Sequence, residues 1–345
     1  MEKISPAYAR IVLRELTAAG TDADRVLEGT TLDREQLDSG GDITIDDFVT
    51  VLENGRRIRG DERLGLVIGR HSNLLNLGPI AAAVSHAPTI REGLQALENY
   101  LRLHTTYIRI TLFSRLDSMQ IRLDITEDLR DTERYHYESG AMLFQSYLET
   151  VSGRKLEDAI YRFSFPRPDY ADEYPRYFHS PLSFDAEHTT LELPRHWLER
   201  RSPSYDAGVW HQAQLELSHR IRELGANNER VYTEHLRSLL RSLEPPLPDL
   251  SCIAASLHLS ERTLSRRLGR EGTSFRKIKN EVLKHWARQY LLHTDNSVES
   301  IAASLGYQDA ANFRRAFRNW EQCSPQAYRR QSGEAKDCLD SVKAR

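Results

Sequence analysis

Hydrophobic residues in the first 105 positions recur every three or four residues, which is the spacing of one helical face. This pattern predicts three helices, at Pro6–Ala18, Ile45–Arg59 and Thr89–Leu103. Thr44 or Asp46 would cap the second helix by accepting a hydrogen bond from its first turn. The start of the chain is therefore expected to be mainly helical.

Beyond residue 105 the period shortens to two, the alternation of half-buried strands. Tyr107–Leu112 and Met119–Ile125 alternate on either side of a short polar turn and predict a β-hairpin. The helical spacing then returns over Asp131–Val151. Further strands are predicted at Ala159–Phe165, Leu182–Phe184 and Thr190–Leu193, and further helices at Val209–Leu224 and Val231–Leu243. This part of the chain is thus predicted to be a mixed α/β domain.

The pattern breaks at 243–248, where three prolines occupy four positions. Proline cannot continue a helix and favours a stiff extended segment. We therefore divide the chain into an effector-sensing domain at 1–205, a helical connector and Pro-rich linker at 206–248, an all-α module at 249–331 and a disordered tail at 332–345. The connector helix Val209–Leu224 would either pair with a second copy in a homodimer or cover its own domain. The expected fold class is α+β.

The module after the linker contains an internal repeat. Ile253–Leu257 and Ile301–Leu305 have the same five residues, 48 positions apart. A repeat of this length indicates one supersecondary unit used twice. In each copy a short helix precedes a tight turn, where Gly306 of the second copy can adopt a positive φ at no steric cost. Two short helices joined by such a turn form a helix-turn-helix unit.

The second helix of each copy has one apolar and one polar face. Leu264 and Leu268 in copy one, and Phe313 and Phe317 in copy two, would turn inward and leave arginine, asparagine and small residues outside. Arginine pairs with guanine edges, and asparagine with adenine. Between the copies, residues 274–293 predict a helix of about 30 Å, close to the ~34 Å between successive major-groove faces. One chain could then read two adjacent groove segments.

The charge distribution supports a polyanion partner. Residues 249–332 contain 14 Lys and Arg against 8 Asp and Glu, so they carry +6 within a chain of net −3, and the remainder carries −9. A basic module on an acidic body is typical of a nucleic-acid-binding domain joined to a sensor.

Composition indicates the general class of the protein and its cellular compartment. With 39% hydrophobic and 28% charged residues it is an ordinary globular chain. No stretch approaches the ~18 apolar residues of a membrane span, and the N-terminus lacks the apolar core of a signal peptide. The three cysteines, Cys252, Cys323 and Cys338, lack metal-type spacing and fit reduced thiols. We expect a cytoplasmic protein without metal, cofactor or membrane partner.

Several segments of the module resemble the signature of the AraC/XylS family of transcription regulators. They are Ser260–Leu268, Glu271–Phe275, Ile301–Tyr307, Asn312–Phe317 and Ser324–Arg329. Two positions depart from that signature: Ala311 stands where the family often has serine, and Gln322 where it usually has glycine. Upstream, Leu77–Ala83, Leu94–Leu103 and Tyr177–Asp185 resemble the N-terminal domain called arabinose-binding in this family.

The resemblance implies a double helix-turn-helix that binds double-stranded promoter DNA. It places base contacts on Arg262, Ser265, Arg266, Ala310, Ala311, Asn312 and Arg315. Basic side chains nearby are expected to contact phosphates, which position the protein without specifying sequence. These are Arg267, Arg270, Lys277, Lys279, Arg314 and Arg318. Kinship further implies an activator that recruits RNA polymerase under the control of a small-molecule effector.

The effector site is less well defined by sequence. Aromatic residues of the N-terminal body could line an apolar pocket or form its core. The candidates are Tyr107, Tyr137, Phe144 and Tyr161. His104 and His136 are interpreted as hydrogen-bonded surface residues rather than ligand contacts.

Three other classes of protein fit the sequence less well. An enzyme is disfavoured because the chain has no phosphate loop, GxSxG elbow, HExxH or GxGxxG motif, although a Ser-His-Asp set formed only in space stays open. An Ada-like DNA-repair methyltransferase needs several N-terminal cysteines, and the first cysteine here is Cys252. A ligand-independent architectural DNA-binding protein would not need some 240 residues upstream of the linker.

Overall fold

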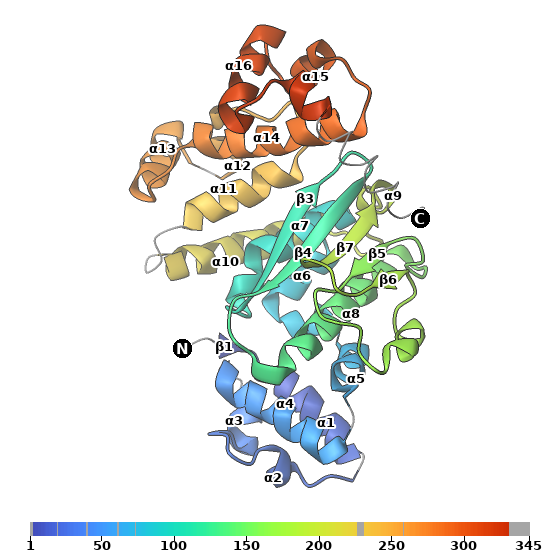
Figure 1. Ribbon diagram of the computed structural model, residues 1–345. Helices are drawn as coiled ribbons and strands as arrows, with labels where there is room; N and C mark the ends of the chain where they lie inside the picture. The colour runs from blue at the N-terminus through green and yellow to red at the C-terminus, as the bar shows by residue number, and fades with distance from the viewer. Residues whose placement is uncertain are drawn as a thin grey trace, which may run out of the picture. The chain divides into compact units, whose positions relative to one another are not determined.

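The structure is a computed structural model that describes residues 3–18, 20–38, 41–60, 62–72, 74–225, 231–257 and 259–330 (Figure 1). The chain divides after Leu224 into two compact units, apart from the turn at 114–117, which is grouped with the second. The tail expected at 332–345 lies outside the described residues. None of the described helices combines the length and hydrophobicity needed to cross a lipid bilayer.

The N-terminal unit begins with a helical layer. Helices α1 (Pro6–Ala18) and α4 (Ile45–Arg59) have the predicted bounds, and Thr44 caps α4 by accepting a hydrogen bond from the Asp47 amide at 3.1 Å. Short elements complete the layer: β1 (Lys3–Ile4), α2 (Ala23–Val26), α3 (Arg34–Asp38) and β2 (Ile43–Thr44). Buried side chains of α1 and α4 form one hydrophobic core with Tyr107 and Tyr135.

A five-stranded mixed sheet follows, in the order β3-β4-β7-β5-β6. The strands are β3 (Ile108–Ser114), β4 (Ser118–Ile125), β5 (Ile160–Arg162), β6 (Leu182–Ser183) and β7 (Thr189–Pro194). The predicted hairpin is β3-β4, while β7 lies antiparallel between β4 and β5, and β6 pairs parallel to β5. All predicted strands therefore exist, although β5 is shorter than the strand predicted at Ala159–Phe165.

Helices pack against this sheet (Figure 1). The two long ones are α7 (Ile90–Tyr100), which continues as the 3₁₀ turn η2 (Leu101–Leu103), and α8 (Glu133–Ser152), preceded by η3 (Arg130–Thr132). Glu98 of α7 accepts a hydrogen bond from the Leu112 amide of strand β3 at 3.0 Å. The remaining helical elements are α5 (Leu64–His71), η1 (Leu74–Leu77), α6 (Pro79–Ser85), η4 (Ala171–Arg176), α9 (Arg195–Leu198) and α10 (Ala207–Gly225).

Helix α5 was not predicted, and its packing explains why. It carries Gly65 and Gly69 in a short apolar run, and glycine disfavours a helix in isolation. A Cβ at Gly65 would lie 2.5 Å from Cα of Tyr135, and one at Gly69 would lie 3.1 Å from Cα of Ser139. The glycines are therefore needed for the close approach of α5 to α8.

The C-terminal unit is all-helical: α11 (Val231–Ser242), α12 (Leu250–Ser256), α13 (Glu261–Arg270), α14 (Phe275–His293), α15 (Val298–Ser304) and α16 (Ala310–Glu321), with 325–330 also helical. Helix α11, assigned by sequence to the connector, contributes Leu236 and Leu240 to the core of this unit. Its first turn is capped by Glu271, which accepts hydrogen bonds from the amides of Tyr232 (3.0 Å) and Thr233 (2.7 Å).

The Pro-rich segment is packed onto the same core. Leu247 is buried, Trp286 of α14 donates a hydrogen bond to the Leu243 carbonyl at 3.3 Å, and Lys279 donates to the carbonyls of Leu247 and Pro248. These bonds hold residues 243–248 against α14 on the C-terminal unit.

Candidate functional site

The first helix-turn-helix consists of α12 and α13. Asp249 caps α12, and the Ser260 hydroxyl caps α13 by accepting from the Thr263 amide at 3.2 Å. Leu264 and Leu268 of α13 are fully buried, as predicted. On the opposite face of α13, three of the predicted base-reading side chains are exposed: Arg262, Ser265 and Arg266.

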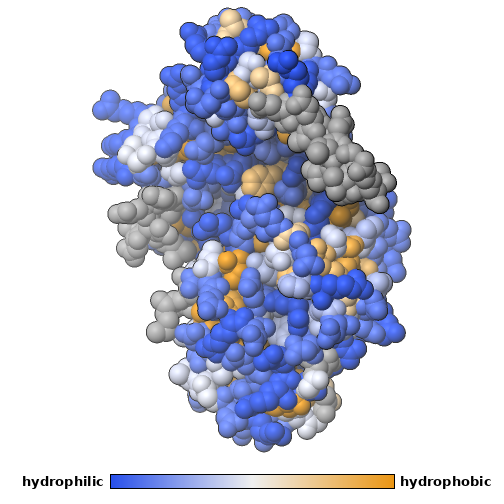
Figure 2. Space-filling view, viewed as in Figure 1, coloured by the Kyte–Doolittle hydropathy of each residue, from blue (hydrophilic) through white to orange (hydrophobic). Residues whose placement is uncertain are grey.

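The second helix-turn-helix, α15 and α16, repeats this design. Gly306 in its turn has φ +83°, and a Cβ there would lie 3.3 Å from Cβ of Pro246, so both conformation and space favour glycine. Phe313 and Phe317 are fully buried. Ala311 and Arg315 are exposed on the other face of α16, where Ala310 and Asn312 are partly exposed. Figure 2 shows mainly hydrophilic surface over α13 and α16.

A chain of side-chain hydrogen bonds runs along the exposed start of α16. Asp309 caps the helix by accepting from the Asn312 amide at 2.7 Å and also accepts from Asn312 Nδ2 at 2.8 Å. Asn312 Oδ1 in turn accepts from Arg315 Nη2 at 2.6 Å. The guanidinium of Arg315 is thus held at one nitrogen while its other donors can face a ligand.

The six basic residues predicted to contact phosphates fall into three groups: exposed residues, one exposed residue in an ion pair, and two residues bonded within the unit. Arg270, Lys277 and Arg318 are exposed. Arg314, also exposed, forms an ion pair with Glu299. Arg267 stacks over Tyr232, 4.4 Å from the ring centroid, and also bonds its hydroxyl. Lys279 is the residue bound to the Pro-rich segment. These last two would have to give up bonds within the unit to reach DNA.

Helices α14 and α16 are joined by a charge cluster around Glu321. Its carboxylate accepts from Arg288 Nε at 2.7 Å and Nη2 at 2.9 Å, and lies 3.2 Å from Lys284 Nζ. Burial alone would raise the pKa of Glu321, but the bonds from Arg288 and Lys284 outweigh it and lower the pKa. The ionised carboxylate therefore fixes the second reading helix to the connecting helix.

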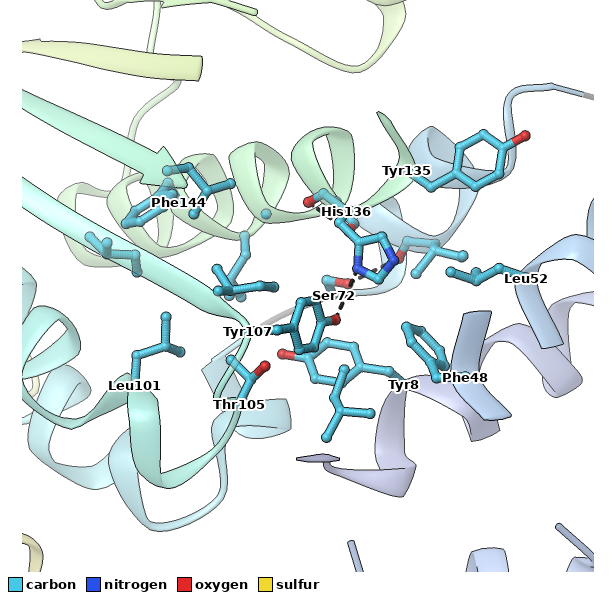
Figure 3. Close-up of a pocket in the computed structure, with 18 of the residues that line it drawn as sticks. Tyr8, Phe48, Leu52, Ser72, Leu101, Thr105, Tyr107, Tyr135, His136 and Phe144 are labelled. Atoms are coloured by element: carbon cyan, nitrogen blue, oxygen red, sulfur yellow. Dashed lines mark hydrogen bonds between the residues drawn. The ribbon is translucent and has the colours of Figure 1, made fainter. Parts of the chain in front are cut away.

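The N-terminal unit encloses a cavity of about 60 Å³, several times the roughly 10–15 Å³ that one water requires. Residues of α1, α4, α5, α7, β3, β4 and α8 line it (Figure 3). The lining includes Tyr8, Phe48, Leu101, Tyr107, His136 and Phe144, and none of the described residues that line it is Lys, Arg, Asp or Glu.

His136 is the polar centre of this cavity. Its ring lies edge-on to Phe48 and Tyr107, with centroids 5.6 and 5.4 Å away, and its Nδ1 is 2.9 Å from the Tyr107 hydroxyl (Figure 3). Its Nε2 is buried without a hydrogen-bond partner. Burial lowers the pKa of His136 to about 3, so the imidazole is neutral. The interpretation of His136 as a surface residue is therefore wrong, because residues distant in sequence cover it.

The predicted effector residues are only partly brought together. Tyr107 and Phe144 line the cavity, whereas Tyr137 stacks on Phe165. Tyr161 lines a second, smaller void, which Phe144 also borders. The other histidine, His104, is partly exposed, and its Nε2 lies 3.3 Å from the Tyr8 hydroxyl. No signal in the sequence indicated that His136 is buried, because polar and apolar residues are mixed on all sides of helix α8. Within the described ranges, no group of three or more His, Cys, Asp or Glu could hold a metal ion.

Comparison with known proteins finds a matching domain family for each of the two units. Residues 20–202 match the model for the arabinose-binding domain of AraC transcription regulators, and 253–331 match a helix-turn-helix domain. The chain is 27% identical to the ornithine utilization regulator of Pseudomonas aeruginosa, covering 95% of this chain and 96% of that protein.

Other relatives are also regulators. An HTH-type transcriptional regulator of Mycobacterium tuberculosis is 27% identical, with 94% of this chain and 96% of that protein covered. The crystal structure of the transcriptional regulator CdpR from Pseudomonas aeruginosa is 26% identical, covers 93% of this chain and 97% of its own, and superposes with a TM-score of 0.46. The chain belongs to the AraC family of DNA-binding transcription regulators, with an N-terminal arabinose-binding-type domain and a C-terminal helix-turn-helix domain.

Proposed function

We propose that α13 and α16 read two segments of promoter DNA and that a small molecule bound by the N-terminal unit controls this binding. The observation that carries the DNA-binding part is the matched pair of capped helices, each with a buried apolar face and an exposed arginine-bearing face. The proposed base contacts are Arg262, Ser265, Arg266, Ala310, Ala311, Asn312 and Arg315. Small side chains beside the arginines would let each helix lie deep in the major groove.

Phosphate contacts are proposed for all six basic residues, with different weights. Arg270, Lys277 and Arg318 are exposed, and Arg314 would only exchange an exposed ion pair for a phosphate. Arg267 and Lys279 would act mainly by keeping Tyr232 and the Pro-rich segment in place, since their donors are already bonded.

Effector control, activation and dimerisation complete the proposal. The proposed effector would bind in the cavity of the N-terminal unit. A ligand that binds two conformations of the protein with different affinity shifts their populations. Helix α10 exposes Val209 (39%) and Leu215 (44%), which a second copy could cover in a homodimer. Recruitment of RNA polymerase is proposed from membership of this family alone.

The deciding experiment maps the genomic fragments bound by the purified full-length protein. We expect a few promoter sites that share two motifs about one helical turn apart. Diffuse, salt-sensitive binding with no shared motif would contradict the proposal and favour an architectural role. A reporter driven by a mapped promoter, compared with and without the protein, then separates activation from repression.

A further inference from the structure

The cavity in the N-terminal unit has a composition that selects its ligand. Among the described residues, no charged side chain lines the cavity, whose lining consists of aliphatic and aromatic side chains with a few hydroxyls and one imidazole. Burying an ionised group in such surroundings without a partner costs several kcal/mol. A carboxylate or an ammonium group would therefore be disfavoured there, and so would a molecule with many hydroxyls.

Two polar atoms of residues that line the cavity lack a hydrogen-bond partner: Oγ1 of Thr105 and Nε2 of His136. His136 is enclosed by Phe48 of α4 and Tyr107 at the start of β3, and its Nε2 has no hydrogen bond (Figure 3). A buried polar group left without a partner costs free energy comparable to a lost hydrogen bond. Such a group in a native fold needs an explanation, and a ligand that supplies the missing bond provides one.

The neighbouring bond indicates which kind of partner is missing. A neutral imidazole has one N–H, and the nitrogen that carries it is set by the bond made at the other nitrogen. The Tyr107 hydroxyl lies 2.9 Å from Nδ1. We assign the hydroxyl as the donor to Nδ1, which satisfies the hydroxyl hydrogen and leaves the imidazole hydrogen on Nε2. The missing partner is then a hydrogen-bond acceptor.

We propose that this cavity binds a small, uncharged, mainly apolar molecule whose single oxygen accepts a hydrogen bond from Nε2 of His136. This inference rests on the effector control proposed above and names the chemical class of the effector. The apolar part of the ligand lies against Phe48, Leu101 and Phe144, where its transfer from water supplies most of the affinity. The histidine fixes the orientation of the oxygen.

The test measures calorimetric binding to the full-length protein without DNA. The probes are methyl ketones of increasing chain length, the carboxylates of the same chain lengths and the corresponding alkanes. We expect at least one ketone to bind about tenfold more tightly than its matched carboxylate and its matched alkane. Equal or tighter binding of the carboxylates, or no binding of any ketone, would overturn the proposal.

Two further measurements locate the site. His136→Phe removes the donor and keeps a ring of similar size, so ketone affinity should fall about tenfold. His188→Phe makes the same change at an exposed histidine outside the cavity and should have no effect. Unchanged ketone affinity in His136→Phe would refute the role of Nε2.

In the wild-type protein, the imidazole ¹⁵N signals assigned to His136 should show the ring protonated at Nε2 and should move on adding the ketone; protonation of His136 at Nδ1 would overturn the assignment. This spectrum does not depend on the stability of a variant. Binding of the mapped operator is assayed separately, so that a failed ketone titration leaves the DNA-binding proposal standing. Loss of operator binding, conversely, would leave the cavity assignment standing.

Discussion

At the scale of single residues, hydrogen bonding decides which exposed side chains are organised for recognition. Arg315 is held by Asn312, which is itself bonded to the helix cap Asp309. An arginine whose rotamers are already restricted loses less conformational entropy when it meets a guanine. Asn312 therefore has two proposed roles: it orients Arg315 and can also face DNA.

This arrangement predicts graded effects on operator binding. Arg315→Ala should cost about 1–3 kcal/mol and relax specificity at one base pair. Asn312→Ala should weaken binding less while leaving the preferred base at the Arg315 position unchanged, because the guanidinium is retained. Quantitative footprinting on the operator and on single-base variants measures both. Arg109→Ala, an exposed arginine of the N-terminal unit, is the control. If Arg315→Ala bound the operator with wild-type affinity, Arg315 of α16 would not be a base contact.

Gln322 ends α16 with φ 58°, in the left-handed region. That conformation costs a residue with a Cβ roughly 1–2 kcal/mol and costs glycine little. Gln322→Gly should therefore raise the free energy of unfolding by about 1 kcal/mol. Urea denaturation measures this, and Gly306→Ala, at φ +83°, should have the opposite sign. A less stable Gln322→Gly would mean that the glutamine side chain contributes more than its backbone conformation costs.

Glu138 is a fully buried carboxyl whose Oε1 accepts hydrogen bonds from the hydroxyls of Tyr170 (2.7 Å) and Tyr174 (2.5 Å), while its Oε2 has no partner. Burial raises its pKa to about 7, despite the opposing tyrosine bonds. The folded state then binds a proton more tightly than the unfolded state, so stability is full below the ordinary carboxyl pKa and falls as pH rises through 7.

The expected loss of stability between pH 5 and 8 is about 1–3 kcal/mol. Glu138→Gln should remove this dependence and be more stable than the wild type at pH 8. Denaturant unfolding across this pH range measures the difference between the two proteins. Parallel curves for the two proteins would show that Glu138 has an ordinary pKa.

At the scale of elements, the C-terminal unit depends on α14, which contacts both α15 and α16 and carries the partners of Glu321. The two reading helices can keep a constant spacing only if each is fixed to this connector. The Glu321 cluster does so for α16 with charged hydrogen bonds, which are stronger than neutral ones.

Glu321→Gln should lower the free energy of unfolding by about 1–3 kcal/mol at neutral pH, because Arg288 and Lys284 lose their shared anion. The pKa of Glu321 is lowered in the folded state, so the contribution is present above the ordinary carboxyl pKa and disappears as pH falls through the folded value. The unfolding curves of the variant and the wild type should therefore differ at neutral pH and converge at acidic pH. Asp295→Asn, at an exposed position of the same unit, serves as the control.

At the scale of the whole molecule, charge is unevenly divided, with +6 on residues 249–332 and −9 elsewhere. A basic module attracts DNA by releasing counterions from it, and this attraction weakens steeply with salt. The acidic remainder would repel DNA and so limit non-specific binding by the N-terminal unit.

Lys277→Ala should reduce the slope of log affinity against log salt by about one and weaken all sequences about equally. Salt titrations with operator and with random DNA measure this slope. Lys279→Ala provides a contrast: it should lower the stability of the unit by freeing the Leu247 and Pro248 carbonyls, with a smaller change in slope. The reverse pattern would mean that Lys279, rather than Lys277, meets the phosphate.

Local sequence determined much of this protein. The bounds of α1 and α4, the hairpin β3-β4 and the paired helix-turn-helix units all follow from periodic burial, caps and a repeat, signals that act over only a few residues. The exposed faces of α13 and α16 follow from the same spacing. These features could be predicted because each is encoded within one element.

Tertiary structure alone decided the rest. Helix α5 exists because Gly65 and Gly69 let it approach α8, and the Pro-rich segment is held by Trp286 and Lys279 of α14. The cavity joins Phe48, Tyr107 and His136 from three separate elements. Burial of His136 and its unpaired Nε2 depend on which distant residues surround it, and periodicity within a single helix carries no such information.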